Sequence, residues 1–269
     1  MGEGRKSAEW GIMNPVRIGR AFAGACLVSM LALGLATAKP AKTAHATRLP
    51  DWDGVWAPDE GPVFDPSVAQ RPENKGRDIY QMRDYPPYNA EYERKYRAIL
   101  DGNDAGKPYN DPAARCLPLG MPRMMGLYPV EFILSPKRTT ILFEQYSQVR
   151  RIFTDGRKHP DDIEPGFTGH SIGHWEGDTL VVDTVGIRGD LTFDTIGTPH
   201  SDALHITEHL RRTSRDIIED RITIDDPKAF TRPWTVIRHY RRQPDWQIEE
   251  FVCENNRNAP DANGVTTFR

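Results

Sequence analysis

The second half of the chain alternates between apolar and polar residues with a period of two, which is the repeat of a β-strand. From Tyr128 onward, tight turns such as Glu-Gly-Asp and Gln-Pro-Asp separate these segments. Short turns between alternating segments predict antiparallel hairpins. The predicted strands cover residues 130–136, 139–146, 148–155, 169–177, 178–187, 203–214, 216–226, 234–242 and 246–254.

Eight to nine strands in succession, with no helical pattern between them, predict an all-β protein. We expect an up-and-down antiparallel β-barrel of the lipocalin-like kind over residues 128–258. The interior of an eight-stranded barrel is just wide enough for a small ligand. A β-sandwich is the alternative arrangement of the same strands.

Residues 51–127 form a different region, which we expect to wrap around the barrel. Ten prolines between residues 57 and 125 exclude long regular elements there. One helix is predicted near 89–101, because Asn89 can cap its start and Gly102 can end it. The segment 51–59, with two tryptophans, predicts a short strand or the entry to one.

The chain begins with a basic leader and an apolar run that ends in Ala-Thr-Ala, which is the order of a secretory signal peptide. We therefore predict a signal peptide over 1–38, with Met1 or Met13 as its start, and a periplasmic or secreted protein without stable membrane insertion after cleavage. An uncleaved anchor is the alternative. The segments 39–50 and 259–269 are predicted to be a flexible N-terminus and a C-terminal tail.

Removal of residues 1–38 changes the charge balance. It takes away four of the 35 basic and two of the 38 acidic residues, which leaves 31 against 36 and a net charge of −5. The remaining basic pairs are interspersed with acids and form no basic stripe. The composition therefore gives no electrostatic reason to expect a nucleic-acid partner.

Two cysteines lie outside the predicted signal peptide, Cys116 and Cys253. An even number of cysteines in an oxidising compartment predicts one disulfide, here between the proline-rich region and the last predicted strand. Two free buried thiols are the alternative.

Several predicted strands place an ionisable side chain on their apolar face. Glu208 shares the parity of Leu204, Ile206 and Leu210, so it should point toward the core with them. By the same test Arg151, Glu144 and Glu250 point inward, and His170 shares a face with Ile172 and His174.

Two accounts explain inward charges. In the first, Arg151 pairs with Glu144 or Glu208 inside an ordinary packed barrel, because an unpaired buried ion is prohibitively costly. In the second, these groups line a ligand cavity, since a pocket needs a few polar groups on an apolar wall.

The second account predicts an enzyme that acts by general acid–base chemistry on a small, partly apolar organic molecule, as a lyase, isomerase, cyclase or hydrolase. His170 and His205 are the proton-transfer candidates, because imidazole titrates near neutral pH. Glu208 and Asp183 would orient them or act as the base, and Arg151 would stabilise an anionic centre. The other predicted substrate-binding residues are Glu144, Tyr146, Ser171, His200 and Glu250. A ligand-binding protein without turnover and a structural envelope protein are the alternatives.

No cofactor is predicted. Residues four apart on a strand lie roughly 13 Å apart, so His170 and His174 cannot share one metal ion. A divalent metal held by histidines from several strands is the alternative, although no CxxC or HExxH spacing is present. The charged segment 150–162 is predicted to be an exposed loop at the barrel mouth, with His159 and Asp155 either solvated or placed over a pocket.

The phrases "CLPLGMP", "RRIFTDGRKHP", "GHSIGHWEGDTLVVDT", "PHSDALH", "DPKAFTRPWT" and "DWQIEEFVCENN" cover nearly all of residues 51–258. They resemble an uncharacterised family of secreted bacterial proteins. The resemblance implies export and brings no assigned activity. The start "DWDGVW" also resembles the entry strand of lipocalin-like barrels.

Overall fold

The computed structural model describes residues 49–61, 63–78, 81–107 and 109–253. The chain divides into two compact units, Met1–His45 and Ala46–Arg269, and all described residues belong to the second. The predicted signal peptide, nearly all of the predicted flexible N-terminus and the predicted C-terminal tail lie outside the described residues.

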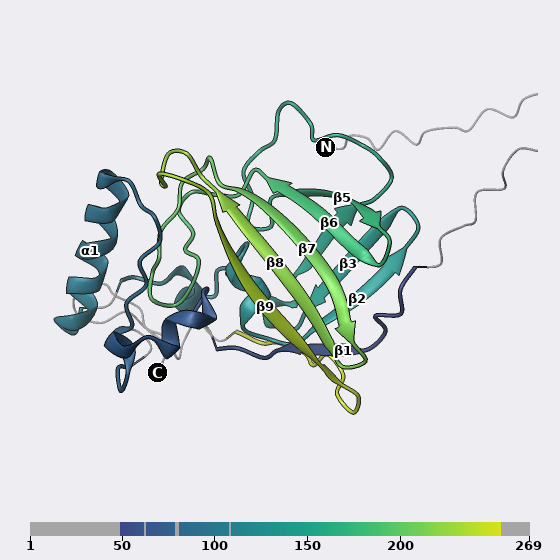
Figure 1. Cartoon of the computed structure of the whole chain (residues 1–269), viewed down its shortest axis with the longest axis horizontal. Coiled ribbons are helices and arrows are strands. Elements are labelled where there is room, and N and C mark those ends of the chain that lie inside the picture. The colour runs from purple at the N-terminus through teal and green to yellow at the C-terminus, as the bar shows by residue number, and fades with distance from the viewer. Residues whose placement is uncertain (1–48, 62, 79–80, 108, 254–269) are drawn as a thin grey trace, which may run out of the picture. The chain divides into compact units, whose positions relative to one another are not determined.

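The described chain forms one closed barrel of nine strands in sequential order, so the prediction of an all-β barrel is confirmed. Figure 1 shows the last three strands as long arrows across the front of the barrel, with the helix α1 to their left. The strands are β1 (Val55–Pro58), β2 (Val130–Ser135), β3 (Arg138–Phe143), β4 (Val149–Phe153), β5 (His170–Glu176), β6 (Thr179–Val185), β7 (His205–Ser214), β8 (Ile217–Asp225) and β9 (Trp234–Gln243).

The topology corrects two details of the prediction. β4 and β5 pair in parallel, with Ile152 opposite Ser171, so the barrel is not purely up-and-down. The connection over 154–169 is long enough to return the chain to the end from which β4 started.

The barrel is closed by β1, which pairs with both β2 and β9. Because β9 is therefore paired on both sides, residues 246–253 have no free edge to join and form no strand, contrary to the prediction.

The wrap docks on the barrel through aromatic rings and one buried arginine. Trp52 and Trp56 are almost fully buried, and Phe64 packs against Phe193 with ring centroids 5.0 Å apart. The guanidinium of Arg238, from the inner face of β9, donates to the backbone carbonyls of residues 60, 61, 63, 64 and 126. These hydrogen bonds hold the proline-rich segment against β9.

The helix α1 (Ala90–Asp104) begins where predicted, because the Asn89 side chain accepts hydrogen bonds from the backbone N–H groups of Glu91 and Tyr92. It continues through Gly102 instead of ending there. A Cβ at Gly102 would lie 2.9 Å from the Lys107 carbonyl, so glycine here permits a close backbone approach inside the helix. The short 3-10 helices are η1 (Pro66–Gln70), η2 (Pro72–Asn74), η4 (Pro112–Arg115), η5 (Arg123–Gly126) and η6 (Gln145–Ser147).

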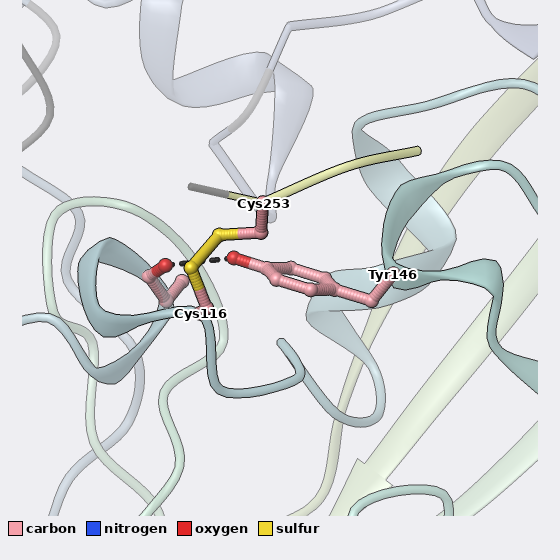
Figure 2. Close-up of a disulfide and its surroundings, with 4 residues drawn as sticks. Cys116, Tyr146 and Cys253 are labelled. Atoms are coloured by element: carbon pink, nitrogen blue, oxygen red, sulfur yellow. Dashed lines mark hydrogen bonds between the residues drawn. A yellow bond between two sulfur atoms is a disulfide. The ribbon is translucent and has the colours of Figure 1, made fainter. Parts of the chain in front are cut away.

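The predicted disulfide between Cys116 and Cys253 is present, with its Cα atoms 5.7 Å apart. It joins the wrap to the segment that follows β9, across 137 positions of sequence. Figure 2 shows Tyr146 beside it, its hydroxyl donating to the Ala113 carbonyl at 2.7 Å. Among the described residues, no helix is both long and apolar enough to cross a membrane.

Removal of the disulfide should lower the free energy of unfolding by about 2–5 kcal/mol, because the unfolded chain gains the freedom of a long loop. The Cys116→Ser/Cys253→Ser variant should lose this amount in urea unfolding followed by tryptophan fluorescence. Reduced wild type serves as the control and should match the variant. An unchanged unfolding midpoint in both would show that the bond contributes nothing.

Asp84 is a buried carboxyl in the wrap. Its Oδ1 accepts a hydrogen bond from the backbone N–H of Tyr85 at 2.7 Å, and Arg71 Nη1 lies 3.3 Å away. Burial, reinforced by the nearby carboxylate of Asp194, outweighs these contacts and raises the pKa of Asp84 to about 7. The folded protein therefore retains a proton that the unfolded chain releases near pH 4.

The stabilisation associated with this raised pKa is present below about pH 4 and is lost as the pH rises through about 7. Replacing Asp84 by Asn should remove a slope on the order of 1 kcal/mol per pH unit from the unfolding free energy in that window. Urea unfolding at pH 5 and pH 7 measures it. Asp101→Asn, on the exposed side of α1, is the matched control; equal slopes in the two variants would contradict the assignment.

Candidate functional site

A buried ion pair crosses the barrel interior from β4 to β7. Glu208 is fully buried and points inward as predicted. Arg150 Nη1 donates to Glu208 Oε1 at 2.9 Å, and Nη2 contacts Oε2. The same guanidinium donates to the hydroxyls of Ser171 and Thr184, at 3.3 and 3.0 Å. Arg150 thus contacts both oxygens of the buried carboxylate, and the two hydroxyls accept from its remaining N–H groups, as a buried charge requires.

The partner of Glu208 is Arg150, not the predicted Arg151. On β4 the inward positions are Arg150 and Ile152, which are 1 % and 0 % exposed, whereas Arg151 is exposed. The sequence test took Val149 and Phe153 as the inward residues, and both are only half-buried. A shift of one residue exchanges the two faces of a strand, so the predicted inward orientation of Arg151 is wrong. Its role as an anion-stabilising group stays a prediction.

Asp220, on β8, is a second inward acid, which the sequence analysis did not select although it shares the parity of Ile218 and Ile222. Within the described residues, neither of its carboxylate oxygens has a hydrogen-bond partner. Burial and the charge of Glu208 raise its pKa well above the usual carboxyl value. The interior therefore combines one satisfied ion pair with an acid that favours its neutral form.

Three of the predicted catalytic residues gather on the outer face of the barrel instead of inside it. His170, Asp183 and His205 lie on β5, β6 and β7, which are adjacent in the sheet. His205 Nε2 is 3.0 Å from Asp183 Oδ1. His159, from the connection between β4 and β5, completes the group: its Nε2 is 2.9 Å from Asp183 Oδ1 and its Nδ1 is 2.8 Å from His170 Nδ1. We call these four residues the histidine cluster.

The histidine cluster is partly exposed. The side chains of His159, Asp183 and His205 are 20 %, 43 % and 40 % accessible, so solvent and a small ligand can reach them. His170 is half-buried and stacks on Phe153, with ring centroids 5.6 Å apart. Partial burial, followed by the neighbouring charges of His159 and Arg157, lowers the pKa of His170 below its ordinary value. The lowered pKa favours the neutral imidazole.

The hydrogen bonds assign the protons of the cluster when all three imidazoles are neutral. An ionised carboxylate only accepts, so His159 and His205 each donate to Asp183 through Nε2–H. His159 Nδ1 then carries a lone pair, and His170 must donate to it through Nδ1–H. Two lone pairs are left free, on His170 Nε2 and His205 Nδ1. The cluster can therefore accept a proton at either of two basic nitrogens.

A cavity of about 300 Å³ lies beside the cluster on the same outer face. Asp183 borders both. Its lining includes Ile172 and Val181, from β5 and β6, and Arg157, from the connection after β4. This volume is at the small end of the range for ligand pockets.

The remaining predicted binding residues do not join this site. Ser171 is inside, hydrogen-bonded to Thr184 at 2.9 Å. His200 is buried before β7, where Nδ1 donates to the Ser201 carbonyl and the ring contacts Phe193. Tyr146 stands beside the disulfide.

The inward orientation predicted for two acids is wrong. Glu144 follows the end of β3 and is half-buried, accepting a hydrogen bond from the backbone N–H of Glu249 at 3.1 Å. Glu250 is exposed in the segment after β9. Both were assigned an inward face on the assumption that 139–146 and 246–254 are strands throughout.

His159 is the member of the histidine cluster whose position the sequence could not predict. It precedes Pro160 in an irregular, charged segment, where no parity exists to predict the direction of a side chain. Within the described part of the chain, no group of three or more His, Cys, Asp or Glu residues is arranged to hold a metal ion.

Comparison with known proteins adds no assignment: no family model, curated protein or solved structure matches the chain. The resemblance to secreted bacterial proteins and the lipocalin-like character of the barrel stay predictions.

The buried ion pair yields a stability prediction. Replacing Glu208 by Gln leaves Arg150 charged and uncompensated, so the free energy of unfolding should fall by about 3–5 kcal/mol. The neighbouring exposed Arg151→Gln variant should stay within about 0.5 kcal/mol of wild type. Arg150→Met/Glu208→Leu should recover most of the loss, because it removes both charges. Urea unfolding measures all three; a tolerated Glu208→Gln change would refute the pairing.

Proposed function

We propose that this protein is an enzyme that transfers protons to and from a small, partly apolar organic molecule by general acid–base catalysis. The observation that carries the proposal is the continuous hydrogen-bond chain from Asp183 through His159 to His170. A base oriented by a second group that is itself held by a carboxylate is the arrangement used to activate imidazoles in enzymes.

His170 acts as the general base through its free Nε2. When it takes a proton there, Nδ1–H still donates to His159, which can share the positive charge and lies against the Asp183 carboxylate. The carboxylate thus stabilises the imidazolium without itself being protonated. Because its pKa is lowered, His170 is unprotonated and ready to act as a base near neutral pH.

His205 provides the second proton-transfer site. Its Nε2–H is held by Asp183, which leaves Nδ1 to receive or return a proton. Two basic nitrogens joined through one carboxylate suit reactions in which a proton leaves one atom and another is delivered nearby. Lyase, isomerase and cyclase reactions share this requirement, and hydrolysis uses the same base to activate water.

We infer a periplasmic or secreted location. The disulfide supports it, because such bonds persist in oxidising compartments. The predicted signal peptide and the resemblance to secreted proteins agree with it, and the acidic balance of the mature chain gives no reason to add a nucleic-acid partner.

A ligand-binding protein without turnover is the second candidate, favoured by the presence of a pocket-sized cavity beside the cluster. In that case the histidines would only hydrogen-bond the ligand. The two candidates differ in whether protons are exchanged, which the following experiment measures.

Deuterium incorporation from D₂O into a panel of small carbon acids and hydroxy acids, followed by NMR, reports proton transfer directly. The mature wild type should exchange at least one member of the panel. His170→Gln should reduce the rate about 10²–10⁴-fold, the usual contribution of a general base. The rate should rise with pH and level off with an apparent pKa below about 6.5, the ordinary imidazole value.

His239→Gln is the matched control, because His239 lies on β9 and pairs with Glu60, away from the cluster. It should exchange at the wild-type rate. Asp183→Asn should move the apparent pKa of the rate profile downward, since the imidazolium loses its counter-charge. Wild-type exchange by His170→Gln would eliminate the proposed base, and no exchange by any folded form would favour the binding candidate.

A further inference from the structure

The cavity beside the histidine cluster is lined by one guanidinium, that of Arg157, and by the Asp183 carboxylate that also belongs to the cluster. Ile172 and Val181 add apolar side chains to the lining. A ligand that fits must therefore match a positive group and an apolar surface next to a site of proton transfer.

Arg157 is held in a fixed orientation with donors to spare. Asp155 accepts from its Nε at 2.9 Å and from its Nη2 at 2.6 Å. The guanidinium carbon lies 3.8 Å from the centroid of the Phe153 ring. This pairing does not use Nη1, and the Arg157 side chain is 46 % accessible. A preorganised guanidinium with an unused edge is well suited to bind a planar oxyanion.

Asp183 is the carboxylate of the same lining. Its Oδ1 accepts from both His159 and His205, so a cation bound there would share this oxygen with two N–H donors. Protonation of either histidine during the reaction would reduce the negative potential there. Arg157 Nη1, which the pairing with Asp155 leaves unused, is therefore the donor through which the cavity can bind an anion.

We infer that the cavity selects a small organic carboxylate of roughly ten to fifteen non-hydrogen atoms, whose anionic end binds Arg157 and whose apolar body crosses Ile172 and Val181 toward the cluster. The inference deepens the proposed function and depends on it for the word substrate. Arg157 is thus a specificity-determining residue that holds the carboxylate of the molecule on which His170 and His205 act.

Three probes of nearly equal size test the charge preference: phenylacetate, phenylacetamide and 2-phenylethylamine. Each is titrated into the mature full-length protein, and the methyl NMR signals of Ile172 and Val181 report binding in the cavity. Phenylacetate should bind at least tenfold more tightly than the amide and the amine. Equal binding of the three probes, or tightest binding of the amine, would overturn the inference.

The Arg157→Gln variant should bind phenylacetate at least tenfold more weakly than wild type and bind phenylacetamide with unchanged affinity. Arg241→Gln is the matched control, because Arg241, on β9, makes the same Nε and Nη2 pairing with Asp59 but does not line this cavity. Asp155→Asn removes the competing carboxylate, so it should retain the preference for the anion or increase it. Loss of the preference in Asp155→Asn, or its survival in Arg157→Gln, would overturn the inference.

His170→Gln separates this inference from the proposed function. It should bind phenylacetate as wild type does while losing proton exchange. Selective anion binding without exchange in any form would refute the enzyme and leave the anion site standing. Exchange without a preference for phenylacetate would refute the anion site and leave the enzyme standing.

Discussion

The ion pair between Arg150 and Glu208 fixes which face of each strand turns inward. Glu208 can be buried only where a cation meets both of its oxygens, and Arg150 also binds the hydroxyls of Ser171 and Thr184. Inner positions of β4, β5, β6 and β7 are thereby specified together. Since neighbouring residues on a strand face opposite ways, the same contacts place His170, Asp183 and His205 outward. The outer cluster is a consequence of the inner pair.

The two polar groups have different chemical capacities because they differ in burial and saturation. Inside, every oxygen of Glu208 is engaged and solvent is absent, so the pair stabilises one arrangement of strands. Outside, Oδ1 of Asp183 accepts both imidazole N–H groups, which leaves a lone pair on each of two imidazoles. A site that exchanges protons needs free lone pairs and access to solvent or substrate. Of these two groups, the outer one has both.

Much of this architecture follows from local sequence rules, and the exceptions have physical causes. Periodicity located eight of the nine strands, and parity placed Glu208, because long alternating segments with clear apolar residues leave one choice of face. Parity assigned the wrong face to Arg150 and Arg151, because these two adjacent arginines lie among apolar residues of both parities. It also missed β1 as the closing strand, since closure depends on which edges remain unpaired after the sheet has formed. His159 was only noted as able to lie over a pocket, because an irregular loop has no repeat from which a direction can be derived.

Because β4 and β5 pair in parallel, the residues proposed to set ligand preference lie in a connection outside the strands that stabilise the barrel. The chain leaves the barrel after Phe153, makes an excursion that carries His159 and Arg157, and re-enters beside the strand it left. Among the described residues, the pairings of the nine strands with one another use no residue of this segment, which pairs only through the bridge between Gly166 and Ile187. Related chains could therefore diversify this one segment, by exchange or insertion, and acquire new ligand preferences while inheriting an unaltered scaffold.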